Sequence, residues 1–393
     1  MTTIQLPAAG GDVEALDRPD DQPVFRAPQP FAARKLFAAP HVVANPRGNY
    51  VPGSNGSIDI EKTVEYRKFL WSYGLGVAEM MSTAERPAIA WDEMKRLIEA
   101  TGSEAKKVGG EVICGIDSDQ FDRTQPPTDI AGVTRAYREQ LEFVESQGMR
   151  AVIRGSRHLA RMATTAEDYA SVYRAIIDNA TSPVFIHWSG RVFVPEFAPY
   201  WGSEDTAVAL ESMLKIIEES DGKVAGLKIS LLQPEVEKEV RRRLPSSCRV
   251  FTGDDYNFDE LLMPDAEDGR YSDALLGILT SIAPLAAEAM ALIDQGDDAA
   301  AGALLSRSIP LSKAIFEAPA NRYASGVVFL AYLNGFQDHF RMIGGGEGNR
   351  PIEHYATVFK EAAAVGLIQD WDLAVSHFRP ILETAGIAQK NAG

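Results

Sequence analysis

The sequence has few of the features that mark disulfide-stabilised proteins or proteins with short metal-binding motifs. It contains two cysteines in 393 residues, Cys114 and Cys248, and each lies in or beside an apolar segment without CxxC spacing. Such isolated cysteines argue against a disulfide framework or a cysteine-based zinc site, and they predict reduced thiols in the core. The six histidines form no HxH or HxxxH pair, so no histidine motif points to a metal either.

Long apolar runs and basic clusters are also missing. No stretch reaches the roughly 20 apolar residues that cross a bilayer, and the N-terminus is acidic where a secretory signal would be apolar. The net charge of −16 disfavours binding to a phosphate backbone. The basic run 241–243 ends a helical stretch, where cations are favoured in any case. We therefore expect a cytoplasmic protein without nucleic-acid or membrane partners.

The chain does contain a regular alternation of short apolar runs and longer amphipathic stretches. Eight strand-like runs occur at Lys35–Ala44, Gly76–Met81, Glu111–Ile116, Met149–Arg154, Pro183–His187, Val224–Ile229, Arg249–Thr252 and Ala274–Leu279. Helical periodicity lies between most of them and is weakest after Thr252. This pattern predicts an α/β protein with a (β/α)8 TIM barrel in residues 35–300. Residues 1–34 are expected to form an extended N-terminal arm, and residues 301–393 a helical extension packed on the barrel.

Lys228 is the strongest candidate for chemistry in the predicted barrel. It lies between Leu227 and Ile229 in a short strand. Helices cover the outside of barrel strands and side chains fill the inside, so a lysine within a strand has no hydrated face. If Lys228 faces inward, desolvation favours its neutral amine, which is the form that attacks carbonyl groups. The alternative is a structural lysine at the strand end, paired with a carboxylate such as Glu79.

The segment Gly226-Leu227-Lys228 resembles the strand of the dihydrodipicolinate synthase and N-acetylneuraminate lyase family whose lysine forms an imine with the substrate. Four other segments resemble that family in the same order and at comparable spacing: Met81–Glu85 its Gly-Thr-Thr-Gly-Glu turn, Pro183–His187 its fifth strand, Thr252–Asp255 its Ser-Gly-Asp-Asp turn, and Gly277–Pro284 its eighth strand and following turn. The likeness spans about residues 35–300.

The resemblance implies a Schiff-base lyase or aldolase of carbohydrate metabolism that needs no cofactor. Its substrate would be a 2-keto acid or a keto-sugar-derived carbonyl compound, and C–C cleavage, condensation or dehydration would follow imine formation. The resemblance also implies a homodimer or homotetramer.

Roles for individual residues follow from the same resemblance. Lys228 would be the nucleophile, and His187 stands where the family usually has a proton-relaying tyrosine, a role that a histidine can also fill. Ser82 and Thr83 are expected to bind a substrate carboxylate, because a turn that leads into a helix presents unpaired donors. Their alternative role is helix capping. Arg191 lies one position from an arginine of some family members.

Four further residues complete the candidate site. Glu79 is a carboxylate in an apolar run, expected either to face the barrel interior or to occupy a strand end. Trp188 is expected to line the substrate pocket. Asp254 and Asp255 follow the seventh strand, at the rim where barrel active sites assemble, although they can also cap the next helix.

Two departures and two alternatives stand beside this interpretation. Met81 and Ala84 replace both glycines of the family turn, which puts any positive φ there in question. A divalent-metal-dependent sugar isomerase or epimerase would use Glu79, Asp117, His187 and Asp254, which fall near successive strand ends. The other alternative is a noncatalytic metabolite-binding barrel, since the fold alone does not confer activity.

Overall fold

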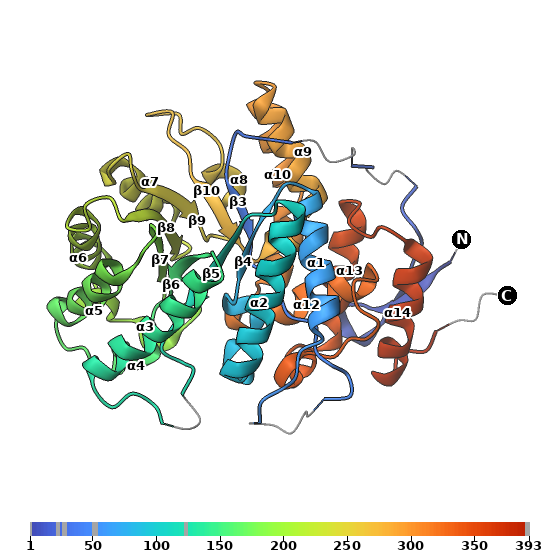
Figure 1. Cartoon of the computed structure of the whole chain (residues 1–393). Coiled ribbons are helices and arrows are strands. Elements are labelled where there is room, and N and C mark those ends of the chain that lie inside the picture. The colour runs from blue at the N-terminus through green and yellow to red at the C-terminus, as the bar shows by residue number, and fades with distance from the viewer. Residues whose placement is uncertain (1, 21–23, 26–29, 49–53, 122–124, 390–393) are drawn as a thin grey trace.

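The fold is a closed barrel of parallel strands (Figure 1), seen in a computed structural model that describes residues 2–20, 24–25, 30–48, 54–121 and 125–389. The barrel strands are β3 (Leu36–Ala38), β4 (Gly76–Glu79), β5 (Val112–Ile116), β6 (Arg150–Ile153), β7 (Val184–Ser189), β8 (Val224–Ser230), β9 (Arg249–Thr252) and β10 (Asp273–Leu276). They follow one another in chain order, and β10 closes the barrel by pairing with β3. Each strand overlaps a segment predicted from the sequence, so the predicted (β/α)8 fold is confirmed.

Helices surround the strands, as Figure 1 shows for α3, α5 and α6 beside β5 to β8. They are α1 (Ile60–Ser72), α2 (Trp91–Val108), α3 (Ile130–Ser146), α4 (Arg157–Met162), α5 (Ala166–Asn179), α6 (Thr206–Glu218), α7 (Pro234–Arg243), α8 (Phe258–Leu261) and α9 (Ala283–Asp294). Local sequence signals start several of them; for example, Thr165 and Asp168 form a reciprocal capping box at α5. After β9 the helix is the single short turn α8, which explains the weak helical period there.

A layer of phenylalanine rings fills the barrel interior below the candidate site. The rings of Phe37, Phe185 and Phe251, from β3, β7 and β9, have centroids 5.3 to 6.1 Å apart. Gly226 in β8 leaves room for them, because a Cβ atom there would come within 2.6 Å of Phe185 and 2.7 Å of Phe251. This aromatic layer forms the floor on which the polar side chains of the next layer rest.

Strand periodicity determines which side chains occupy that next layer. Successive strand residues point to opposite sides of a sheet. Because Phe185 faces inward, His187 two residues later in β7 also faces inward, and β7 and β8 pair with His187 opposite Lys228. Leu227 and Ile229, the neighbours of Lys228, pack outward against the helices. Lys228 therefore points into the barrel, as the inward-facing interpretation of the sequence predicts.

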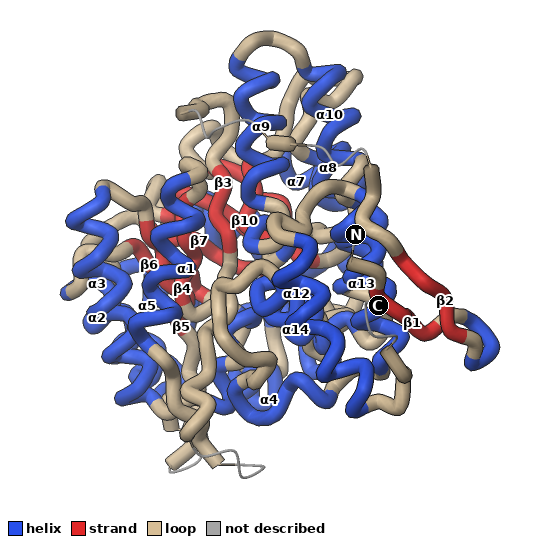
Figure 2. Tube along the Cα trace, turned by 90° about the vertical axis from the view of Figure 1, so that its right-hand side faces the viewer, coloured by secondary structure: helices blue, strands red, loops and turns tan. Residues whose placement is uncertain are grey.

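The N-terminal arm contains a structure that the sequence did not predict. Strands β1 (Ile4–Pro7) and β2 (Val13–Leu16) form an antiparallel hairpin at the side of the molecule (Figure 2). Ile4 and Leu6 are fully buried in the same hydrophobic cluster as the C-terminal helices. Hydrogen bonds also join Gln5 to Gln389, so the two ends of the described chain lie side by side. The short strand period was obscured by the many Pro, Gly and Asp residues around it.

The C-terminal extension is helical, as predicted. It comprises α10 (Asp298–Ser306), α11 (Ile309–Ile315), α12 (Ala324–Leu333), α13 (Ile352–Ala364) and α14 (Trp371–Thr384). Figure 1 shows α12, α13 and α14 in red, packed on the side of the barrel next to α1. Within the described part of the chain, no helix is both long enough and apolar enough to cross a membrane.

Candidate active site

Lys228 lies in a small cavity at the carboxyl-terminal rim of the barrel, the end at which barrel enzymes carry their active sites. Its side chain is buried, with 8% of the residue exposed. The same cavity is lined by His187 from β7, Asp255 after β9, Ser82 after β4 and Tyr323 from the C-terminal extension. Five segments that are far apart in the sequence thus meet around one amine.

Burial changes the protonation of Lys228. Loss of hydration lowers its pKa from 10.5 to about 8, the negative charge of Asp255 opposes this shift, and the positive charge of Arg154 adds to it. Burial likewise raises the pKa of Asp255 from 3.8 to about 7, although the backbone N–H of Ile278 donates a hydrogen bond to its carboxylate at 3.0 Å. Lys228 and Asp255 are therefore two buried groups whose charges influence each other and whose pKa values are both shifted toward neutral pH.

Gly253 gives Lys228 the space that it occupies. A Cβ atom at this position would lie 2.1 Å from Ser230 Oγ and 2.7 Å from Lys228 Cε. Contacts this short do not occur in folded proteins, so any larger residue would displace the lysine side chain or the β9 loop. The glycine of the segment Thr252–Asp255 thus has a steric function in positioning the Lys228 side chain.

His187 is held beside Lys228 as a neutral imidazole. Its Nε2 lies 3.1 Å from Ser230 Oγ. Burial, followed by the positive charges of Lys228 and Arg154, keeps the pKa of His187 well below its ordinary value. A neutral ring can accept a proton from a neighbouring group or donate a hydrogen bond, but it does not add another positive charge to the cavity.

The turn after β4 brings two hydroxyl groups to the site. Ser82 is exposed at the cavity, where Arg154 Nη2 lies 3.3 Å from its Oγ, and Thr83 is buried with its Oγ1 2.8 Å from the hydroxyl of Tyr323. Met80 and Glu85, on either side of this turn, both have φ of 53°. Such left-handed backbone is strained for residues other than glycine and is concentrated at functional sites.

A family model described as "Protein of unknown function (DUF993)" matches residues 4–387. The chain belongs to this family. A comparison with curated proteins finds no match.

Solved structures resemble this DUF993 protein over most of its length. Dihydrodipicolinate synthase from Bacillus anthracis is 15% identical with a TM-score of 0.62, and the match covers 84% of this chain and 98% of that one. The Thermotoga maritima enzyme is 16% identical with a TM-score of 0.60, covering 85% and 99%. KD(P)GA from T. tenax is 19% identical with a TM-score of 0.59, covering 84% and 98%. The resemblance inferred from the five sequence segments is therefore confirmed at the level of the fold.

Two of the predicted pocket residues of the DUF993 protein face away from the cavity. Glu79 is fully buried on the outer side of β4, where Arg67 donates to both carboxylate oxygens at 2.9 and 3.0 Å and Thr101 donates at 2.9 Å. Trp188 packs in the hydrophobic layer between barrel and helices. The pocket position predicted for Trp188 and the inward-facing interpretation of Glu79 were both wrong, because each residue is one position away from an inward-facing neighbour. Glu79 occupies the end of β4, which was its other interpretation.

Two other predicted substrate-binding residues also have different surroundings. Asp254 accepts hydrogen bonds from the backbone of Tyr256 and Asn257 and from the Asn257 side chain at 2.8 to 3.1 Å, so it stabilises the turn after β9. Arg191 is exposed in the loop after β7, outside the lining of the cavity. Asp254 therefore neither lines the cavity nor caps α8, which begins after Asn257 without a side-chain cap, and Arg191 is not placed to bind a substrate in this structure.

Sequence reasoning missed Arg154, which follows β6 and contacts Ser82 beside the cavity. Its side chain is only 13% exposed, and Nη1 lies 3.2 Å from Asp117. Its Nε is buried and has no hydrogen-bond partner among the described residues. Gly115 makes room for it, since a Cβ there would lie 2.8 Å from Arg154 Cδ. The available signal was a charged residue directly after a predicted strand.

The residues proposed for a metal site do not form one. Glu79 is paired with Arg67, Asp117 with Arg154, and Asp254 with the turn that follows it. Among the described residues there is no group of three or more His, Cys, Asp or Glu side chains that could hold a metal ion. The metal set predicted from strand-end positions was therefore wrong in its geometry.

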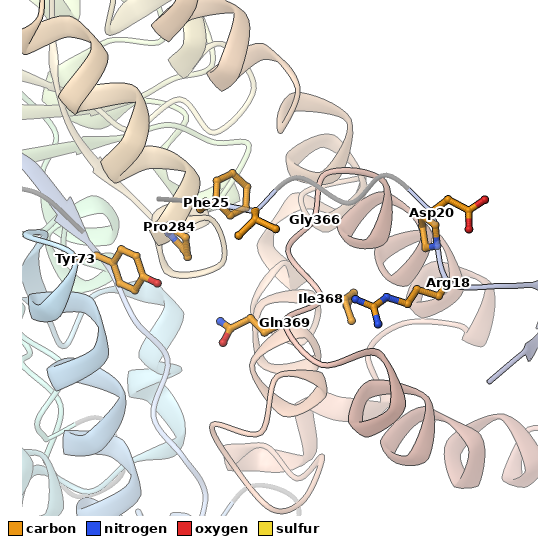
Figure 3. A pocket seen from close by; sticks show the side chains of 10 residues that line it. Arg18, Asp20, Phe25, Tyr73, Pro284, Gly366, Ile368 and Gln369 are labelled. Carbon is orange, nitrogen blue, oxygen red and sulfur yellow. The ribbon is translucent and has the colours of Figure 1, made fainter. Parts of the chain in front are cut away.

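A larger pocket of about 500 Å³ lies elsewhere, between the N-terminal segment, α1, α9 and the loop before α14 (Figure 3). Its charged lining residues, Arg18 and Asp20, are exposed and therefore hydrated. Tyr73, Pro284 and Gln369 form other parts of its wall. The smaller cavity around Lys228 carries the stronger chemical argument, because its ionisable groups are buried and interact with one another.

Proposed function

We propose that this protein is a Schiff-base-forming lyase or aldolase that acts on a carbonyl substrate through Lys228. One observation carries this proposal: an inward-facing lysine at the active-site rim of the barrel has a pKa lowered to about 8 by burial. A lysine with such a pKa presents much more neutral amine at pH 7 than an exposed one, and neutral amine is the nucleophile for imine formation. The lyase type is also supported by the names of the solved structures that share the fold.

The residues around Lys228 have complementary chemical roles in this proposal. The amine adds to the substrate carbonyl, and when a neighbouring acid protonates the hydroxyl of the adduct, that hydroxyl leaves as water and a protonated imine remains. That cation accepts the electron pair of an adjacent C–C or C–H bond. Asp255, with its pKa near 7, is suited to exchange protons with the amine, while burial keeps His187 neutral, so that its ring can donate or accept a hydrogen bond.

Arg154 and Ser82 support a 2-keto acid over a neutral keto sugar. Ser82 lines the cavity, and Arg154 lies behind it with Nη2 3.3 Å from the Ser82 Oγ and an unpaired Nε donor. Burial, with the neighbouring Asp119, raises the pKa of Asp117 to about 7, so the acid beside Arg154 is partly neutral and leaves positive charge for a substrate anion. An arginine and a hydroxyl are suitable donors for a carboxylate.

Borohydride trapping tests the proposal. The wild-type chain is incubated with a panel of 2-keto acids and keto sugars, reduced, and digested for peptide mass spectrometry. We expect a substrate-dependent adduct on Lys228 that is absent from Lys228→Ala and retained in Lys223→Ala, a matched exposed lysine in the same segment. No adduct across the panel would refute imine chemistry and favour the noncatalytic metabolite-binding barrel.

We also propose that the protein is a homodimer or homotetramer, which sedimentation velocity would test.

A further inference from the structure

We propose that the C-terminal extension is part of the active site, and that its Tyr323 is the catalytic residue that moves protons to and from the substrate bound to Lys228. This inference rests on the proposed function and deepens it. It assigns a chemical role to a part of the chain that lies outside the barrel.

Tyr323 directly precedes α12 and reaches over the rim into the cavity that Lys228 lines. Its hydroxyl is 2.8 Å from Thr83 Oγ1, and either oxygen can donate this hydrogen bond. Its ring stacks on Phe316 with centroids 4.4 Å apart and an interplanar angle of 12°. Phe193 from the loop after β7 meets the same ring edge-on at 6.3 Å. The three rings form a roof above the amine, and the tyrosine hydroxyl is the polar group of that roof.

The extension is joined to the catalytic loops by direct hydrogen bonds. The Ser312 hydroxyl donates to the backbone carbonyl of Asp255, and the Tyr256 hydroxyl donates to the carbonyl of Phe316. Arg350 donates to the carbonyls of Glu317, Ala318 and Pro319 at 2.7 to 3.1 Å, which fixes the segment between Phe316 and Tyr323. Because hydrogen bonds fix this segment at several points, the three rings have a defined position in the site.

The barrel is also shaped to receive these rings. Gly277, which follows β10, has no side chain where a Cβ atom would lie 3.0 Å from Tyr323 Cε2 and 3.2 Å from Phe316 Cζ. A larger residue would push both rings away from the cavity. Barrel and extension are thus complementary in shape at the point where the tyrosine enters.

The proposed proton transfers balance over the imine cycle. Addition of the Lys228 amine to the carbonyl gives a neutral carbinolamine. Tyr323 donates its proton to the carbinolamine hydroxyl, which leaves as water, so a protonated imine and a phenolate form together as an ion pair. The phenolate then removes a proton from the carbon next to the imine, and the C–H electron pair moves into the new C=C bond of a neutral enamine. The phenol is restored, and no other reactant is required.

Burial supports this order of events. It raises the pKa of Tyr323, so the resting side chain is a protonated phenol and begins the cycle as a donor. A buried phenolate is unfavourable by itself, but it is formed beside the newly created cation of the imine. The same phenolate is then a strong base at the moment when a carbon acid must lose its proton.

The experiment measures two events separately: formation of the imine on Lys228 and removal of a proton from the adjacent carbon of the substrate. Pyruvate is the probe, because it has a carbonyl group and exchangeable protons on the adjacent carbon. NMR follows exchange of its methyl protons in D2O, and borohydride trapping reports the imine on Lys228. Tyr323→Phe removes only the hydroxyl, and Thr83→Val removes its partner. Tyr355→Phe is the matched control, since Tyr355 is another buried tyrosine of the extension and donates to a backbone carbonyl, that of Glu347, at 2.7 Å.

We expect Tyr323→Phe to lose exchange by roughly 100-fold or more, the usual contribution of a general acid–base group. The adduct on Lys228 should form more slowly, because loss of water from the carbinolamine then lacks its acid, but it should reach the wild-type yield after long incubation. Thr83→Val should show a smaller loss, and Tyr355→Phe should behave like wild type. Wild-type exchange in Tyr323→Phe would overturn this inference and leave the imine proposal standing. Failure of the wild type to trap pyruvate or any other member of the panel would overturn both.

Discussion

The Asp255→Asn variant tests how the negative charge of Asp255 affects the pKa of Lys228. At a pKa of about 8, Lys228 is about 9% neutral at pH 7, compared with about 0.03% for a lysine with a pKa of 10.5. Asp255 opposes the effect of burial, because its negative charge stabilises the ammonium form. Removing that charge lowers the pKa of Lys228 further. If the change is about 1, the low end for a charge in close proximity, the neutral fraction at pH 7 rises about fivefold.

The assay is the rate at which pyruvate forms a reducible adduct on Lys228, measured with cyanoborohydride between about pH 6 and pH 10. A lysine-containing peptide in the same buffers corrects for the reductant. For the wild type, the rate should rise with pH and level off above about pH 8, since Lys228 is then mostly neutral. For Asp255→Asn, the trapping rate should rise at lower pH than for the wild type. The rise should follow a single ionisation, because the carboxyl group that titrates together with Lys228 has been removed.

Asp254→Asn is the matched control for this series. Asp254 is the adjacent carboxylate, but it is bound to the turn formed by Tyr256 and Asn257. Its substitution should weaken the turn and reduce stability without moving the rise of the trapping rate. The reasoning is refuted if the wild-type rate keeps rising to pH 10, as for a hydrated lysine, or if Asp255→Asn moves the profile to higher pH.

Three further substitutions test other parts of the site. Glu79→Gln leaves a buried arginine unpaired and should lower the free energy of unfolding by about 3 kcal/mol. Glu211→Gln breaks an exposed pair, in which the carboxylate side chain is 63% exposed, and should have a much smaller effect; equal losses in chemical denaturation would contradict the structural assignment. Arg154→Met should raise the KM for pyruvate roughly 10- to 100-fold and leave the KM for neutral hydroxyacetone unchanged. An equal rise in KM for both compounds would exclude anion recognition by Arg154. Gly253→Ala should abolish trapping, because the added Cβ atom would lie 2.7 Å from Lys228 Cε; Gly348→Ala, where a Cβ atom meets no neighbour, is the control. An unchanged adduct yield in Gly253→Ala would show that the structure relaxes around this contact without displacing the lysine.

The position of Lys228 could be predicted from the sequence because local rules determine it. Short apolar runs at regular spacing give the strands, and strand alternation with outward-facing Leu227 and Ile229 gives the direction of the lysine. The pairing of His187 with Lys228 follows from their neighbouring strands. These properties depend on residues within one or two strands, and such residues are visible in a sequence pattern.

The same periodicity also explains the errors. Glu79 and Trp188 lie in strands buried on both faces, where inward and outward residues are equally apolar. A shift of one residue in the assumed register reverses the face, and composition cannot correct it. For Arg154 and Tyr323 the limit is different, because the turn after β6 and the approach of the extension are set by packing between segments far apart in the chain.

The turn between Met80 and Glu85 shows how this protein keeps a strained backbone without the glycines of the family that it resembles. Met81 and Ala84 stand in the glycine positions, yet the left-handed conformations occur at Met80 and Glu85, at a cost of roughly 1–2 kcal/mol each. Arg86 donates to the Met80 carbonyl at 3.1 Å, and the Met80 N–H donates to Glu79 at the same distance.

Glu79 therefore connects the buried pair with Arg67 to the backbone that presents Ser82 and Thr83. Strain of this kind persists only where the surroundings hold it on both sides, and here an arginine holds the carbonyl while a carboxylate holds the amide. Although Glu79 lies outside the cavity, it has a positioning role for the hydroxyl groups at the site.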